Sequence, residues 1–273
     1  MAPEAGFANP CEEKEGRYVA RKAMRRIALI RSDAATDVMR AASGEPIVLA
    51  LDSAGSRCSV LVAAGETVLA AERHAAMHGQ AERLLPMVDA VMRKSGLSPA
   101  ALDIVATTIG PGSFTGIRVG LAAVRGIALA TRARPVGVTG FEAVAAGVAA
   151  RVYKRGDSLL LVALESRRDD LYIQLFDHAC CPLGDPTAIM PAALDEALGD
   201  LAGMAPLVVA GDAAQRAACV LSPRSCAIIV EESAPDSTGV LRAVLNHAGA
   251  GDRRAKPLPL YLRPPDVTVS TAH

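Results

Sequence analysis

The hydrophobic and polar positions along the chain follow two periods, and their order occurs twice. Short apolar runs, which favour buried strands, alternate with longer stretches whose apolar residues recur every three or four positions, as on one face of a helix. In the first half this pattern predicts strands at residues 47 to 52, 58 to 64, 67 to 73, 104 to 110 and 135 to 139, and helices at residues 78 to 95, 116 to 131 and 141 to 152. The order is three strands, helix, strand, helix, strand, helix.

The second half shows the same order after a polar break at residues 154 to 158. It predicts strands at residues 159 to 165, 171 to 177, 188 to 190, 207 to 211 and 227 to 232, and helices at residues 191 to 202, 213 to 221 and 237 to 249. We therefore predict an α/β protein with a duplicated unit, its lobes at residues 46 to 153 and 154 to 273. The Pro-rich segment KPLPLYLRPPDV should run over the surface, because Pro disrupts both helices and sheet interiors.

Residues 1 to 45 differ from the rest of the chain. Six basic residues and no acidic one lie from Arg17 to Arg31. This pattern could form a basic amphipathic helix. Four Glu residues before this stretch count against a transit peptide. We predict a disordered basic extension, with Met39 as an alternative start of the protein.

Composition narrows the function classes. The chain has 273 residues, 51% of them hydrophobic, and its 29 basic residues balance 29 acidic ones, so the molecule as a whole should not attract nucleic acid or membrane. Aromatic residues make up 3% and Trp is absent, which argues against a general base-stacking protein and restricts any RNA contact to a local site. Six Cys without a CxxC pair indicate reduced thiols in the cytoplasm. No membrane span is predicted.

The stretch TTIGPGSFTGIRVGLAAVRGIALAT, residues 107 to 131, predicts a strand, a Gly-rich turn and a helix. The free amide groups at such a helix start favour anions, which makes Gly112 and Ser113 candidates for contact with a ligand. No Lys follows as in a phosphate loop of the GxxxxGK[ST] kind. The alternative is a turn that only packs tightly.

The duplicated plan resembles the superfamily of actin, sugar kinases and heat-shock chaperones. In that superfamily an acidic residue at the end of the first strand faces nucleotide phosphates and metal, and Asp52 followed by Ser53 stands at that place here. More specifically, LALDSAGSRCSV, HGQAERLLPMVD, IGPGSFTGIRVGLAAVRGIA, PVGVTGFEA and PLYLRPPDV resemble the TsaB/YeaZ family of bacterial tRNA threonylcarbamoyladenosine biosynthesis proteins. The resemblance covers about residues 46 to 267.

The resemblance implies a role in a complex. Members of the family pair with TsaD, a larger subunit of similar fold that carries the transfer site, and act with the ATPase TsaE to attach threonylcarbamoyl to the adenosine beside the tRNA anticodon. TsaD binds metal through two His four positions apart, and alignment on PVGVTGFEAV puts Gly140 and Val144 at those places. Neither side chain can bind a metal ion. The resemblance thus implies a non-catalytic scaffold or activating subunit that binds no cofactor alone, while ATP and metal belong to the complex.

The family also implies contact with TsaD through two helices, or a homodimer when the partner is absent. On this basis we expect the partner-binding residues to be the apolar ones of the two helices, namely Leu84, Leu85, Val88, Val91, Met92, Ile117, Leu121 and Val124. The alternative is that these residues only cover the chain's own sheet.

Two other functions stay open. An autonomous small-molecule kinase or ATPase of the same superfamily needs a second acidic hairpin, for which this chain offers Glu165 in ESRRDDLY where the family has a pattern like DARRGEVY. A metallopeptidase would need metal ligands, and His74 and His78 have the HxxxH spacing but no evident third ligand. Ser113 has no motif-linked His that would make it a nucleophile.

Overall fold

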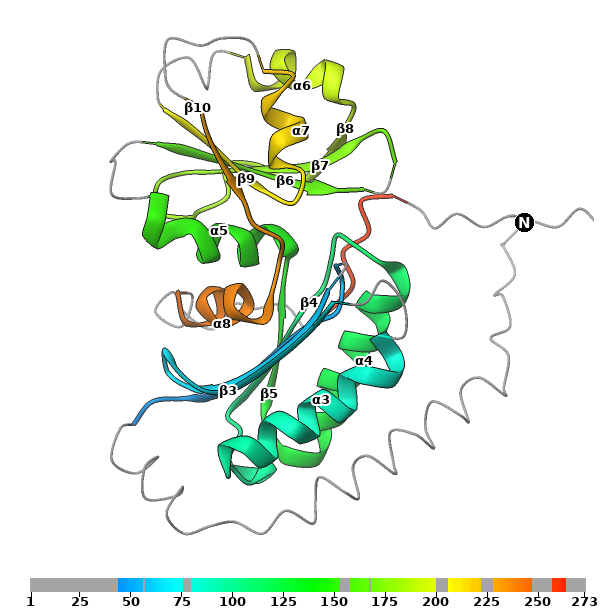
Figure 1. Ribbon diagram of the computed structural model, residues 1–273, viewed down its shortest axis with the longest axis vertical. Helices are drawn as coiled ribbons and strands as arrows, with labels where there is room; N and C mark the ends of the chain where they lie inside the picture. Colours follow the sequence, from blue (N-terminus) through cyan, green and yellow to red (C-terminus); the bar gives the residue numbers. More distant parts are fainter. Residues whose placement is uncertain are drawn as a thin grey trace, which may run out of the picture.

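The computed structural model of the chain describes residues 44–55, 57–75, 80–152, 158–166, 168–199, 206–221, 228–246 and 257–263 (Figure 1). The predicted extension at residues 1 to 45 lies almost wholly outside these residues, and so does His78. The strands are β1 Ile47–Asp52, β2 Arg57–Ala64, β3 Thr67–Ala75, β4 Ile104–Thr108, β5 Arg134–Val138, β6 Leu159–Glu165, β7 Leu171–Phe176, β8 Thr187–Ile189, β9 Leu207–Gly211 and β10 Ile228–Glu232.

These strands form two five-stranded sheets of equivalent topology. The first has the order β3-β2-β1-β4-β5 and the second the order β8-β7-β6-β9-β10, so each copy of the unit builds one sheet. In both sheets the first three strands are antiparallel neighbours and the last two run parallel to the first. The predicted duplication is confirmed, and the protein has the two-lobed actin-like and sugar-kinase-like fold.

The helices form three layers around the two sheets. They are α3 Gln80–Ser95, the short 3-10 helix η1 Pro99–Ala101, α4 Phe114–Thr131, α5 Gly140–Val152, α6 Pro191–Leu198, α7 Ala214–Ala218 and α8 Ser237–Asn246. Helices α3 and α4 cover the outer face of the first sheet, α6 and α7 cover the outer face of the second, and α5 and α8 lie between the sheets (Figure 1).

The middle layer joins the two halves of the chain. Helix α8 belongs to the second half in sequence, yet Val240 and Val244 are buried with Val48 and Ala50 of the first sheet. At its start, Ser237 N donates a hydrogen bond of 2.8 Å to Ser59 Oγ of β2. Helix α5 follows the first sheet and buries Phe141, Val144 and Val148 against the second sheet. Each half thus supplies one helix to the other half's core.

Helix α4 begins two residues before the predicted start because Ser113 caps it. The Ser113 hydroxyl accepts a hydrogen bond of 3.2 Å from Gly116 N, which satisfies a free amide of the first turn. By length and hydropathy α4 could cross a membrane, but one side of it is buried against the first sheet. At Gly120 a Cβ atom would lie 2.6 Å from Thr107 Oγ1, so glycine lets α4 approach the sheet closely.

The predicted partner-binding residues lie in the chain's own core. Leu84, Val88, Val91, Met92 and Val124 are buried with the apolar side chains of the first sheet, and Ile117 and Leu121 form a second buried cluster with Ala54. In the isolated chain these seven side chains pack inside the protein, because an amphipathic helix turns its apolar stripe toward the nearest apolar surface, here its own sheet. Their contact with a partner stays a prediction. Leu85 is half-buried at the edge of this core.

Residues 257 to 263, which we call the strap, connect the two lobes (red in Figure 1). Leu260 N donates a hydrogen bond of 2.8 Å to Ile109 O at the end of β4. Arg125 on α4 donates one of 2.8 Å to Pro257 O. On the second lobe, Arg263 forms an ion pair of 2.7 Å with Asp170, whose side chain is buried.

Candidate functional site

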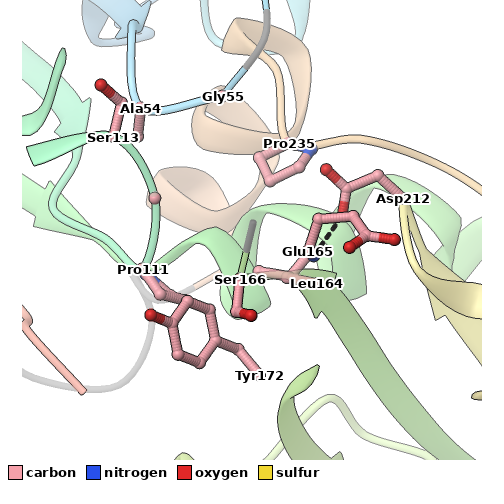
Figure 2. A pocket seen from close by; sticks show the side chains of 11 residues that line it. Ala54, Gly55, Pro111, Ser113, Leu164, Glu165, Ser166, Tyr172, Asp212 and Pro235 are labelled. Atoms are coloured by element: carbon pink, nitrogen blue, oxygen red, sulfur yellow. Dashed lines mark hydrogen bonds between the residues drawn. The ribbon is translucent and has the colours of Figure 1, made fainter. Parts of the chain in front are cut away.

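A cavity of about 380 Å³ lies between the lobes, where the equivalent loops of the two sheets meet (Figure 2). From the first half of the chain it is lined by Ala54, Gly55, Pro111, Gly112 and Ser113. From the second half it is lined by Leu164, Glu165, Ser166, Tyr172, Asp212 and Pro235. The predicted turn and the predicted second hairpin therefore do face the same space.

The Gly-rich turn is packed tightly against the loop after β1. Ser113 N donates a hydrogen bond of 2.7 Å to Ala54 O. Gly112 has a φ of +153°, and a Cβ atom there would lie 2.4 Å from the same carbonyl oxygen. On the far side of the turn, a Cβ atom at Gly110 would lie 2.3 Å from Leu260 O of the strap. Both glycines are needed because backbone from another segment occupies the place of a side chain.

Asp52 and Ser53, the other two candidate residues, lie beneath the cavity and not on its surface. Both side chains are buried, and Ser53 Oγ donates a hydrogen bond of 2.8 Å to Gly116 O. Asp52 Oδ1 accepts hydrogen bonds from Thr108 Oγ1 and from Ala54 N, while its Oδ2 has no partner among the described residues. Burial raises the pKa of Asp52 to about 7, against the opposing effect of the two hydrogen bonds.

The second lobe makes one side of the cavity acidic. Asp212 Oδ1 accepts a hydrogen bond of 2.9 Å from Glu165 N, and the two carboxylates lie side by side near Pro235 (Figure 2). Partial burial away from water raises the pKa of the Asp212 carboxyl group. The negative charge of nearby Glu165 raises this pKa further. Glu165 also forms an ion pair with Arg216 of α7.

This lining does not suit a phosphate group. None of the described residues that line the cavity is basic. Two carboxylates facing the same space would repel an anion. The geometry therefore favours the alternative for the Gly-rich turn, which is tight packing between sheet, helix and strap.

Gly140 and Val144 stand at the first two turns of α5 and face the second lobe. A Cβ atom at Gly140 would lie 3.1 Å from Leu164 Cδ1 and 3.4 Å from Pro235 Cγ, so a larger side chain there would press against Leu164. Val144 is buried in the core of the second lobe. The side chains at these two positions carry no atom that could bind a metal ion.

A second cavity of about 150 Å³ adjoins the first and was not predicted from the sequence. It lies under the strap and shares Pro111, Gly112, Ser166 and Tyr172 with the first cavity. Tyr261 of the strap contributes to its lining. The only signal in the sequence was the aromatic residue inside a Pro-rich segment, which does not say what the segment covers.

The chain is similar to proteins of tRNA modification. A family model described as "TsaD: tRNA N6-adenosine threonylcarbamoyltransferase" matches residues 68–180. The tRNA threonylcarbamoyladenosine biosynthesis protein TsaB of Escherichia coli is 33% identical over 125 residues, which are 46% of this chain and 52% of that protein. The uncharacterized protein Rv3421c of Mycobacterium tuberculosis is 33% identical over 227 residues, which are 81% of this chain and 93% of that protein.

A solved structure agrees in fold. YeaZ from Pseudomonas aeruginosa has a TM-score of 0.65 and 24% sequence identity, and the match covers 80% of this chain and all of that one. The chain therefore matches YeaZ and Rv3421c over nearly their full lengths, but it spans about half the length of the Escherichia coli TsaB protein that it matches.

Proposed function

This chain belongs to the TsaB/YeaZ family, and on that premise we propose that it is a non-catalytic scaffold subunit of a complex that attaches threonylcarbamoyl to tRNA. Its partner would be a TsaD-like subunit that carries the transfer site, with a TsaE-like ATPase, in the cytoplasm. ATP and the metal ion would be bound by the assembled complex.

The observation that carries this proposal is the packing at Gly140 and Val144. A transferase of the TsaD kind binds its metal at the two corresponding positions, whereas here one position is glycine against Leu164 and Pro235 and the other is a core valine. The absence of a metal-binding side chain at both positions supports a role in which this chain assists the active site of another subunit.

The outer side of α3 and of the C-terminal half of α4 is the surface we propose for the TsaD-like partner, away from the start of α4. Leu129 of α4 is 85% exposed, the highest value among the large apolar side chains that the structure describes as exposed. Half-buried Val119 of α4 and Leu85 of α3 lie at the edge of the core, and Ala122 is exposed on α4. Because the TsaD family model matches the region that contains both helices, a TsaD-like subunit would offer a similar pair for packing.

The first experiment is co-expression of this chain with the TsaD-like subunit of the same organism. We expect the two to elute together in size-exclusion chromatography, and we expect threonylcarbamoyl transfer to tRNA to depend on this chain when the partner and the ATPase are present. Transfer by this chain alone, or transfer at full rate without it, would refute the proposed role. Phosphoryl transfer from ATP by the purified chain would instead favour the kinase alternative.

The partner surface has its own test. Leu129→Glu should weaken binding to the TsaD-like subunit by roughly tenfold or more, because it places a charge at the centre of an apolar interface. Leu183→Glu is the matched control, since Leu183 is also exposed, at 52%, but lies on the second lobe. Isothermal titration calorimetry with both variants compares the two surfaces. Equal affinities for both would show that the partner binds elsewhere.

A further inference from the structure

Aromatic side chains gather at one place beside the cleft. Of the aromatic residues that the structure describes, Phe141 and Phe176 are completely buried in the core, and the other three line the cavity of about 150 Å³ under the strap. These three come from distant segments, Phe114 from the start of α4, Tyr172 from β7 and Tyr261 from the strap. We call this cavity the aromatic pocket.

The rings in the aromatic pocket are arranged around a stack. The ring centres of Phe114 and Tyr261 are 5.0 Å apart, with a tilt of 36° between the ring planes. The guanidinium group of Arg118 lies 3.7 Å from the centre of the Phe114 ring, a cation–π contact. Tyr261 is 38% exposed, so this stack reaches the surface of the protein.

Positive charge surrounds the aromatic pocket. Arg168 and Arg263 line it, and Arg118 lies next to it on the exposed side of α4. Arg263 is paired with Asp170, whereas Arg118 forms no ion pair with any described residue. The neighbouring cavity carries the carboxylates of Glu165 and Asp212, so the two adjoining cavities have opposite electrostatic character.

We propose that the aromatic pocket binds one unpaired nucleotide of RNA, with its base against Tyr261 and its phosphate beside the arginines. The face of an aromatic ring can stack on any base, and the arginine side chain is well suited to phosphate oxygens. A pocket that offers both groups therefore matches a nucleotide, which carries both a base and a phosphate. A paired base inside a duplex could not enter a cavity of this size. The proposal rests on the proposed role in tRNA modification, which supplies the RNA.

The test measures binding of RNA to the full-length chain by fluorescence anisotropy. The probes are a labelled RNA hairpin with an unpaired loop and a blunt RNA duplex of the same length. We expect the hairpin to bind more tightly, and Tyr261→Ala to weaken its binding by about fivefold or more, as is usual for loss of one stacked base. Tyr261→Phe keeps the ring and should bind as the unmodified chain does.

The arginine is tested separately because Tyr261→Ala could also loosen the strap. Arg118→Gln should weaken hairpin binding and reduce the slope of log affinity against log salt concentration by about 0.7, the value for one phosphate contact with a single strand. Arg132→Gln removes the same charge at the other end of α4 and should leave the slope unchanged. Arg118 is exposed, so its variant should fold normally.

Three results would overturn the proposal. These are equal affinities for hairpin and duplex, hairpin binding that is unchanged in both Tyr261→Ala and Arg118→Gln, and the absence of hairpin binding by the chain. None of them bears on co-elution with the TsaD-like subunit or on the requirement for this chain in transfer, so the scaffold role is judged by its own assays.

Discussion

Replacing Asp52 by Asn tests whether the protein holds an uncharged carboxyl group beneath the cleft. The Asp52 side chain is fully buried at the end of β1, and its two hydrogen bonds both end on Oδ1. Burial raises its pKa from 3.8 to about 7. Asparagine keeps an oxygen for Thr108 Oγ1 and Ala54 N but cannot become charged, so Asp52→Asn removes the charge and preserves the contacts.

The sign of the effect follows from proton linkage. The folded protein holds the Asp52 proton more tightly than the unfolded chain, so the stability that this group contributes is fully present below pH 3.8 and is lost as the pH rises to about 7. Each unit of pKa difference corresponds to about 1.4 kcal/mol, so the complete loss is about 4 kcal/mol. The Asp52→Asn variant does not lose this stability as the pH rises, because asparagine does not titrate.

The assay is urea unfolding of both proteins at several pH values. Between about pH 5 and about pH 8, the free energy of unfolding of Asp52→Asn should gain about 3 kcal/mol relative to that of the unmodified protein. Thr108→Val serves as a second variant, because it removes the hydrogen bond that favours the charged form and should therefore enlarge the loss with rising pH. Parallel stability curves for Asp52→Asn and the unmodified protein would refute the assignment of a raised pKa.

Two further predictions concern contacts between the lobes. Gly239→Ala should reduce stability by about 1–3 kcal/mol in thermal unfolding, because the added Cβ would lie 2.3 Å from Ala143 O. Gly147→Ala is the control and should be neutral or slightly stabilising, because the nearest atom to its Cβ is 4.0 Å away. Equal melting temperatures for the two variants would contradict this prediction. Arg263→Gln should cost about 1–3 kcal/mol in urea unfolding, because it leaves the buried Asp170 carboxylate without its cation, and a loss that persists when Asp170→Asn is added would point to another cause.

The strands were predictable because each apolar run is bounded by turn residues or polar residues. Residues 47 to 52 were predicted and found as a buried strand, and the Gly65 turn fixed the hairpin that follows. Helix α4 was predicted two residues short, since the pattern of apolar residues does not show that the Ser113 side chain would cap the first turn. The strand and the hairpin were predictable because they depend on residues close together in the sequence.

Periodicity did not reveal what each apolar surface contacts. The stripe with Leu84, Val88 and Val91 looks the same whether it covers a sheet or a partner, and it covers the sheet. Likewise, the acidic residue at the end of the first strand was predicted to face the cleft, but Asp52 is fully buried and does not line the cavity. The meeting of Phe114 with Tyr261 depends on the path of the strap, which no local pattern encodes.

The exchange of helices between the halves has a consequence for protein synthesis. The first sheet is complete in sequence at Val138, but α8, which covers its inner face, begins only at Ser237. A ribosome needs about 5–20 s to add the roughly 100 residues between them, at typical rates of about 5–20 residues per second. During that time Val48, Ala50 and their neighbours lack the part of their cover that α8 supplies, so the nascent first lobe should be a binding site for chaperones until the second lobe has left the ribosome.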